Sequence, residues 1–111
     1  MITIHVTADV NGNYTAFSIA GHAEYGEAGQ DIVCAAVSAL GQTALLGLLK
    51  YAAKQVTYTV KAGALSVSLQ KTDERTQVIM DTMILGLREI TTRYGDYVVL
   101  ALKTSGGGRN V

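Results

Sequence analysis

The sequence predicts a single α+β domain in which two helices pack against one antiparallel or mixed sheet. Three observations support this prediction. Stretches that alternate apolar and polar residues, which are typical of half-buried strands, occur at the start and in the second half of the chain. Two longer stretches carry apolar residues at the spacing of a helix. The resulting order is β-β-α-β-β-α-β within 111 residues, a length that fits one domain.

The chain opens with a predicted β-hairpin. Residues 1–10 alternate between apolar and polar side chains, which predicts a half-buried strand. Asn11-Gly12-Asn13 predicts a tight turn, because Asn and Gly tolerate a positive φ. The second strand is expected over residues 14–20. We expect the first strand to be edge-like, and His5 on its polar face to have a structural role.

A long, mostly apolar helix is expected to begin at Asp31 and to run to about Ala53. Asp31 would be its N-cap, because an aspartate carboxylate can accept an N–H of the first turn. Gly41 and Gly47 weaken the intrinsic helicity but permit another element to approach closely. With the neighbouring alanines they fit either ordinary packing on a sheet or a dimer seam, and the sequence leaves both open. Because polar residues interrupt the stretch, we expect a core helix rather than a membrane span.

The second half of the chain predicts another hairpin and another helix. Strands are expected over residues 55–61 and 64–70, joined by a turn at Ala62-Gly63. Asp73 is the expected N-cap of a helix that runs to about Arg93.

The C-terminal region predicts one more strand and then a tail. The strand is expected over residues 97–102. Residues 104–111 are rich in Ser and Gly and are expected to form a flexible tail. The domain is therefore placed at residues 1–103.

The composition narrows the functional class. Nine Lys and Arg balance nine Asp and Glu, and this zero net charge argues against a direct nucleic-acid binder. With 16% charged and 49% hydrophobic residues, an oligomer that hides part of the surface is expected. A single cysteine, with strand-like residues where a signal peptide would begin, favours a reducing compartment and a cytoplasmic protein. One cysteine and two histidines without ligand spacing predict neither a metal site nor another cofactor.

The only cysteine, Cys34, follows a glycine-punctuated loop that begins with Gly21-His22 and contains Gly26 and Gly29. At the predicted helix start, the helix dipole and free N–H groups would favour the thiolate, which is the nucleophilic form. His22 precedes Cys34 by 12 residues (34 − 22), so a loop can bring it close enough to act as a base. The glycines would let this loop move over a substrate. The alternatives are a cysteine that only packs and a surface histidine.

Four polar residues near this segment have weaker functional signals. Asp31 could be a third catalytic residue, although capping is the simpler interpretation. Ser38 lies four residues after Cys34 and so projects from the same helix face, where it could bond into the site or to its own backbone. Glu24 and Glu27 are expected to be solvated, and over a groove they could attract a basic substrate.

Two segments together resemble a known family. They are Gly21-His22-Ala23 and, after the loop, Gly29-Gln30-Asp31-Ile32-Val33-Cys34-Ala35-Ala36-Val37-Ser38. The pattern G-H-A, a short glycine-containing loop and G-x-D-I-V-C-A-x-x-S is similar to that of the ribosomal-processing cysteine proteases called Prp. The length and the predicted order of elements also agree, so the resemblance covers nearly the whole chain up to about Lys103.

The resemblance implies a cysteine endopeptidase that removes the N-terminal extension of a ribosomal large-subunit protein after a short hydrophobic segment. It implies that Cys34 is the nucleophile, that His22 is the general base, and that Gly21, Asp31 and Ser38 support the site or bind substrate. It also implies a homodimer in which the loop between His22 and Cys34 covers the site. Two other functions remain open: a non-catalytic protein that docks on the same precursor, and a thiol redox sensor.

Overall fold

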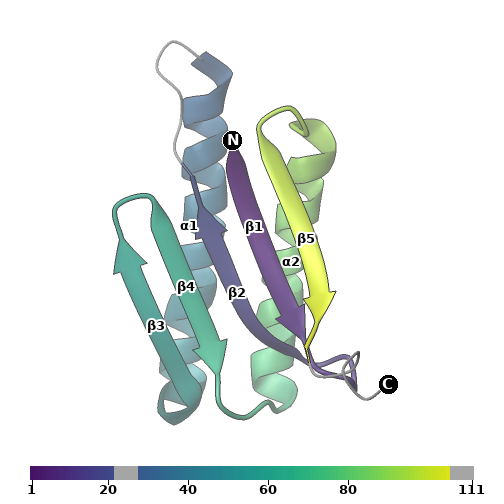
Figure 1. Ribbon diagram of the computed structural model, residues 1–111. Coiled ribbons are helices and arrows are strands. Elements are labelled where there is room, and N and C mark those ends of the chain that lie inside the picture. The colour runs from purple at the N-terminus through teal and green to yellow at the C-terminus, as the bar shows by residue number, and fades with distance from the viewer. Residues whose placement is uncertain (22–27, 106–111) are drawn as a thin grey trace.

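The computed structural model describes the backbone of residues 1–21 and 28–105, and the side chains of all of these except residues 28–30. The predicted order of strands and helices is confirmed (Figure 1). A short 3-10 helix, Ala53–Gln55, follows the first long helix. The elements are β1 (Ile2–Ala8), β2 (Tyr14–Ala20), α1 (Ala28–Ala52), β3 (Val56–Lys61), β4 (Ala64–Leu69), α2 (Glu74–Arg93) and β5 (Val98–Thr104).

The five strands form one mixed sheet in the order β3-β4-β2-β1-β5. β1 and β5 are parallel, whereas the other neighbouring pairs are antiparallel. β1 therefore lies inside the sheet, and the expectation that it is edge-like is wrong. The error has a physical cause, because β5 pairs with β1 from the far end of the chain and local sequence carries no signal of that pairing. His5 remains exposed, on the polar face of β1 as predicted.

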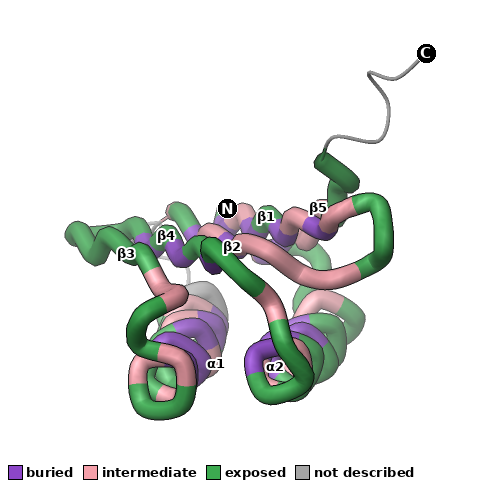
Figure 2. The backbone as a smooth tube through the Cα atoms, turned by 90° about the horizontal axis from the view of Figure 1, so that it is seen from below, coloured by how far each residue is buried: buried purple, intermediate pink, exposed green. Residues whose placement is uncertain are grey.

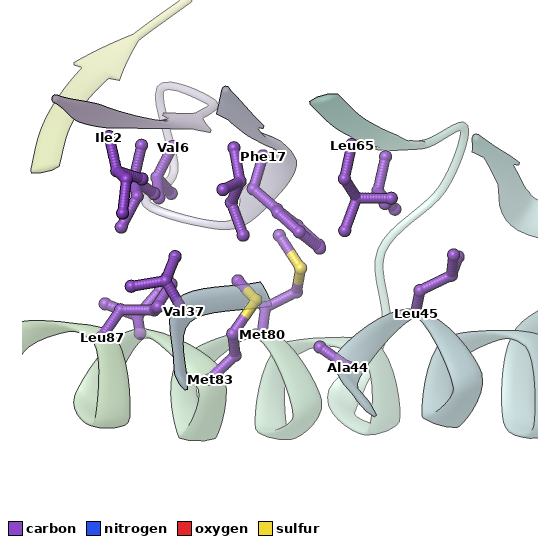
Figure 3. Packing of buried hydrophobic residues seen from close by; sticks show 14 of the residues in the cluster. Ile2, Val6, Phe17, Val37, Ala44, Leu45, Leu65, Met80, Met83 and Leu87 are labelled. Atoms are coloured by element: carbon purple, nitrogen blue, oxygen red, sulfur yellow. The ribbon is translucent and has the colours of Figure 1, made fainter. Parts of the chain in front are cut away.

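Both helices cover the same face of the sheet and leave the other face bare (Figure 2). Apolar side chains from the strands, including Ile2, Phe17 and Leu65, point toward those of the helices (Figure 3). Burying one such large side chain stabilises the fold by about 1.5–3 kcal/mol. The largest fully buried side chains come from β1 and both helices: Ile2, Ile4, Val6, Val33, Val37, Leu48, Thr76, Met80 and Leu87.

α1 approaches the sheet closely at Gly41. A Cβ added there would lie 2.5 Å from Cδ1 of Ile19 in β2 and 3.2 Å from Cδ2 of Leu65 in β4. At Gly47, in contrast, a Cβ would meet Ile79 of α2 at an ordinary contact distance of 3.5 Å. The predicted close approach is therefore confirmed at Gly41, and ordinary packing on the sheet explains that glycine.

α2 is anchored at its start by two sets of hydrogen bonds. Asp73 is its N-cap, as predicted: its carboxylate accepts the Thr76 N–H at 2.9 Å, and its own N–H donates to the Thr76 hydroxyl at 3.0 Å. The Gln77 side-chain amide pairs with the backbone of Tyr14, accepting the N–H at 2.7 Å and donating to the carbonyl at 2.9 Å. These bonds tie the β1–β2 hairpin to the first turn of α2.

The C-terminal strand is longer than predicted. β5 pairs with β1 as far as the Ala8–Thr104 register, and the Ser105 N–H donates to the Ala8 carbonyl at 2.8 Å. The paired structure therefore passes the predicted domain boundary at residue 103. Residues 106–111 of the predicted tail lie outside the described residues.

One helix in the described part of the chain, Asp31–Gln55, is long and apolar enough to cross a membrane. Its buried side chains, among them Val33, Val37 and Leu48, belong to the core cluster that faces the sheet. The helix packs on the core as expected, but only 33% of its apolar stretch is buried, so the expectation that most of its sides are buried is wrong.

Candidate active site

One end of the sheet brings together the start of β1, the end of β2 and the N-terminal part of α1 (Figure 1). Gly21, directly after β2, has a φ of +127°, which side chains rarely allow. A Cβ at this position would collide with the Met1 carbonyl oxygen and lie 3.0 Å from the Ile2 Cα. The Gly21 N–H donates to the Gly63 carbonyl at 3.0 Å. Gly21 is thus held between the N-terminus and the β3–β4 turn, where it sets the direction in which the chain continues to residue 22.

α1 begins at Ala28, three residues earlier than predicted. Asp31 is therefore an acidic residue of the first turn and not the N-cap, and Gly29 lies in the helix rather than in the preceding loop. The misplacement has a physical cause. An aspartate is favourable both as an N-cap and inside the first turn, where its charge interacts with the helix dipole, so its presence alone does not fix the boundary.

The earlier start changes the surroundings of Cys34. It is the seventh residue of α1 (28 to 34), about 9 Å along the axis from the first residue. The predicted location in the first turn is therefore wrong, and the dipole effect, which falls off within that turn, acts on Cys34 less than expected. Among the described residues, the N–H groups without helical partners belong to residues 28–30. Cys34 itself is half-buried and packs against the hydrophobic core.

Three of the predicted site residues share one face of α1. Asp31, Cys34 and Ser38 are spaced by three and four residues, which places them above one another on a helix. Asp31 is exposed, whereas Cys34 and Ser38 are half-buried. The face thus leads from solvent at Asp31 to the half-buried Cys34.

The remaining predicted residues lie where the structure gives no description. His22, Glu24, Gly26 and Glu27 are outside the described residues, so the pairing of His22 with Cys34 stays a prediction. Among the described side chains, no group of three or more His, Cys, Asp and Glu could hold a metal ion. The close approach of Met1 to Gly21 was not predicted, and it follows from the register of β1 against β2, in which Thr3 pairs with Ala20.

Comparison with known proteins gives one consistent result. The family model described as cysteine protease Prp matches residues 1–99. A curated relative, the ribosomal processing cysteine protease Prp of Staphylococcus aureus, is 32% identical over 107 residues, covering 93% of this chain and all of the relative.

Solved structures agree with the sequence match. The S. aureus protease with a covalently linked product peptide superposes with a TM-score of 0.81 at 28% identity. The same protease with a substrate peptide gives 0.82 at 27% identity, and in both cases 93% of this chain and all of the other are covered. A Streptococcus mutans protein gives 0.79 at 26% identity, covering 95% of this chain and 96% of that one.

Proposed function

The chain belongs to the Prp family of cysteine proteases, and from this premise we propose that it removes an N-terminal extension from a ribosomal large-subunit protein. The observation that carries the proposal is Cys34 at a half-buried position on the α1 face that opens toward the helix start. The S. aureus relative, which is covered over its full length, has been solved with a substrate peptide and with a covalently linked product peptide.

We propose that Cys34 is the nucleophile and His22 the general base and acid. The thiolate attacks the scissile carbonyl carbon, and a C–S bond forms as the carbonyl becomes an oxyanion. Collapse of this intermediate breaks the C–N bond, and protonated His22 gives its proton to the leaving amine. Water then loses a proton to His22 and attacks the thioester, which releases the carboxylate product and regenerates Cys34. The unpaired N–H groups at the start of α1 are the candidates to stabilise the oxyanion.

Asp31 and Ser38 have proposed supporting roles because they share the Cys34 face. Ser38 lies one turn further into the helix, where its hydroxyl can orient the sulfur or a substrate carbonyl. Asp31 is exposed one turn nearer the helix start, where its carboxylate can orient an imidazolium. Gly21 acts through the backbone, by directing the chain toward His22.

We also propose a cytoplasmic homodimer. The face of α1 that points away from the sheet is exposed and almost uncharged, and it includes Ile32 and Leu46 as large apolar side chains. A second copy of this chain would cover that face and remove its apolar surface from water. The exposed residues of the face include Ile32, Ala35, Ala36, Ala39, Thr43 and Leu46, with one charge, Lys50, near its C-terminal end.

Sedimentation of a matched pair of variants tests the dimer. Leu46→Asp should shift the protein toward the monomer, because it places a charge in the proposed interface. Leu85→Asp, at a similarly exposed site on α2, should not. Equal sedimentation of both variants and wild type, whether as dimers or as monomers, contradicts this interface.

The protease function is tested with a peptide that spans the precursor's extension and the first residues of the mature ribosomal protein. Mass spectrometry should show one cut by wild type and none by Cys34→Ala or His22→Ala. Circular dichroism should show that these variants stay folded. Cleavage by Cys34→Ala would refute a cysteine nucleophile. Tight binding without cleavage by wild type would instead favour the docking protein, and peroxide sensitivity without hydrolysis would favour the redox sensor.

A further inference from the structure

Burial decreases along the edge strand β3 on the face of the sheet that carries the helices. Val56, at its start, packs against the hydrophobic core. Tyr58 and Val60, the next residues on that face, are 48% and 54% exposed. β3 runs outward from α1 toward the turn that joins it to β4 (Figure 1 and Figure 2). The strand therefore presents two apolar side chains on the helix side of the sheet that the fold itself does not cover.

These two side chains lie beside the face of α1 that carries Cys34. Cys34, Ser38 and Gly41 are spaced by four and three residues and so share one side of the helix. Gly41 packs against Leu65 of β4, and Leu65 pairs with Val60. Val60 therefore lies one strand spacing, about 5 Å, from Leu65, on the side toward the edge of the sheet. Tyr58 follows one pleat further along β3, opposite Val67.

We propose that Tyr58 and Val60 form an apolar shelf that binds alternate side chains of the extended substrate and so helps to determine specificity. The inference rests on the proposed protease function, since the shelf continues the face that carries the nucleophile. An extended chain directs every second side chain to the same side, which matches the spacing of two same-face residues in a strand. The occupant is an apolar, extended segment of the peptide, because the shelf presents an aromatic ring and a branched aliphatic group but no charge.

The geometry predicts which substrate residues reach the shelf. Cys34 and Gly41 are seven residues apart, or about 10 Å along α1. Combined at right angles with the strand spacing of about 5 Å, this places Val60 about 12 Å from the nucleophile. Extended chain covers about 3.3 Å per residue, so Val60 is reached about four residues from the scissile bond and Tyr58 about six. A peptide with only two residues on each side of the bond would not reach either.

The test compares Val60→Thr with Val99→Thr. Both valines are exposed strand residues, 54% and 45%, but Val99 belongs to β5, away from the shelf. Threonine keeps the β-branched shape of valine and replaces one methyl group by a hydroxyl, so the strand should persist while the apolar contact is weakened. Each variant is assayed on the full extension peptide and on a peptide with two residues on each side of the scissile bond. Tyr58→Thr is the second shelf variant.

Each shelf variant should raise KM for the full peptide about tenfold, the lower end of the effect of small changes in apolar contacts, with kcat unchanged. The short peptide should be cleaved equally by wild type and all variants, and Val99→Thr should match wild type on both. Equal losses on the two peptides, no loss on either, or a loss that tracks dissociation of a dimer would overturn the shelf.

Failure of the protease itself is distinguishable. If wild type cleaves neither peptide, the proposed function fails, whereas the shelf can still be tested by anisotropy of the labelled full peptide on Cys34→Ala. Adding Val60→Thr to Cys34→Ala should then weaken binding about tenfold. Unchanged binding contradicts the shelf.

Discussion

The packing of α1 on the sheet makes a quantitative prediction at its two central glycines. Replacing either one by alanine improves helix propensity by about 1 kcal/mol. At Gly47 the new methyl group meets Ile79 at 3.5 Å, so Gly47→Ala should raise the free energy of unfolding by about that amount. At Gly41 the methyl group would lie 2.5 Å from Ile19 and 3.2 Å from Leu65, both of them buried. Overpacking of this kind costs about 1–3 kcal/mol.

The difference between the two variants isolates the packing cost, because the propensity gain is common to both. Gly41→Ala should therefore be less stable than Gly47→Ala by about 1–3 kcal/mol. Urea unfolding followed by circular dichroism measures this difference, with an unchanged m-value confirming that the same surface unfolds. Measurements at several protein concentrations separate folding from dimerisation. Equal stabilities of the two variants would refute the close contact of α1 with β2 and β4.

Two further predictions concern the supports of the fold and the site. Gln77→Ala removes both hydrogen bonds to the Tyr14 backbone and should lower the free energy of unfolding by about 1–3 kcal/mol. Urea titration measures this change, and wild-type stability of the variant would contradict the role of these bonds in tying the β1–β2 hairpin to α2. Gly21→Ala forces a side chain into a positive φ and against the Met1 carbonyl. It should lower kcat/KM at least tenfold even where circular dichroism shows a folded protein, and unimpaired cleavage would show that Gly21 does not position residue 22.

Local patterns predicted most of the fold. Alternation located β1 and β4, and Asp73 located the start of α2 because its capping box is a short-range device. The parallel pairing of β1 with β5 was not predictable in this way, since it joins the two ends of the chain. The start of α1 was misplaced because an aspartate is favourable both as an N-cap and inside the first turn, so Asp31 alone did not fix the boundary.

The candidate site was predicted unevenly. The face shared by Cys34 and Ser38 followed from helical spacing alone, and the structure agrees with it. The conflict between a side chain at Gly21 and the Met1 carbonyl depends on the exact register of β1 against β2, and the exposure of Tyr58 depends on how far the helices cover the sheet. The sequence predicted a strand over residues 55–61, but local patterns did not show that Tyr58 would be left exposed. The sequence thus indicated the reacting residues, whereas the surface around them could be described only from the three-dimensional structure.

The central claim is that Cys34 becomes acylated during peptide cleavage. Rapid acid quenching of wild type with the extension peptide, followed by intact-mass analysis and mapping, tests this claim most directly. The account predicts an adduct on Cys34 equal in mass to the N-terminal cleavage product minus water, present during turnover and absent after substrate is consumed. Cleavage that proceeds in Cys34→Ala, without any adduct in wild type, would contradict it.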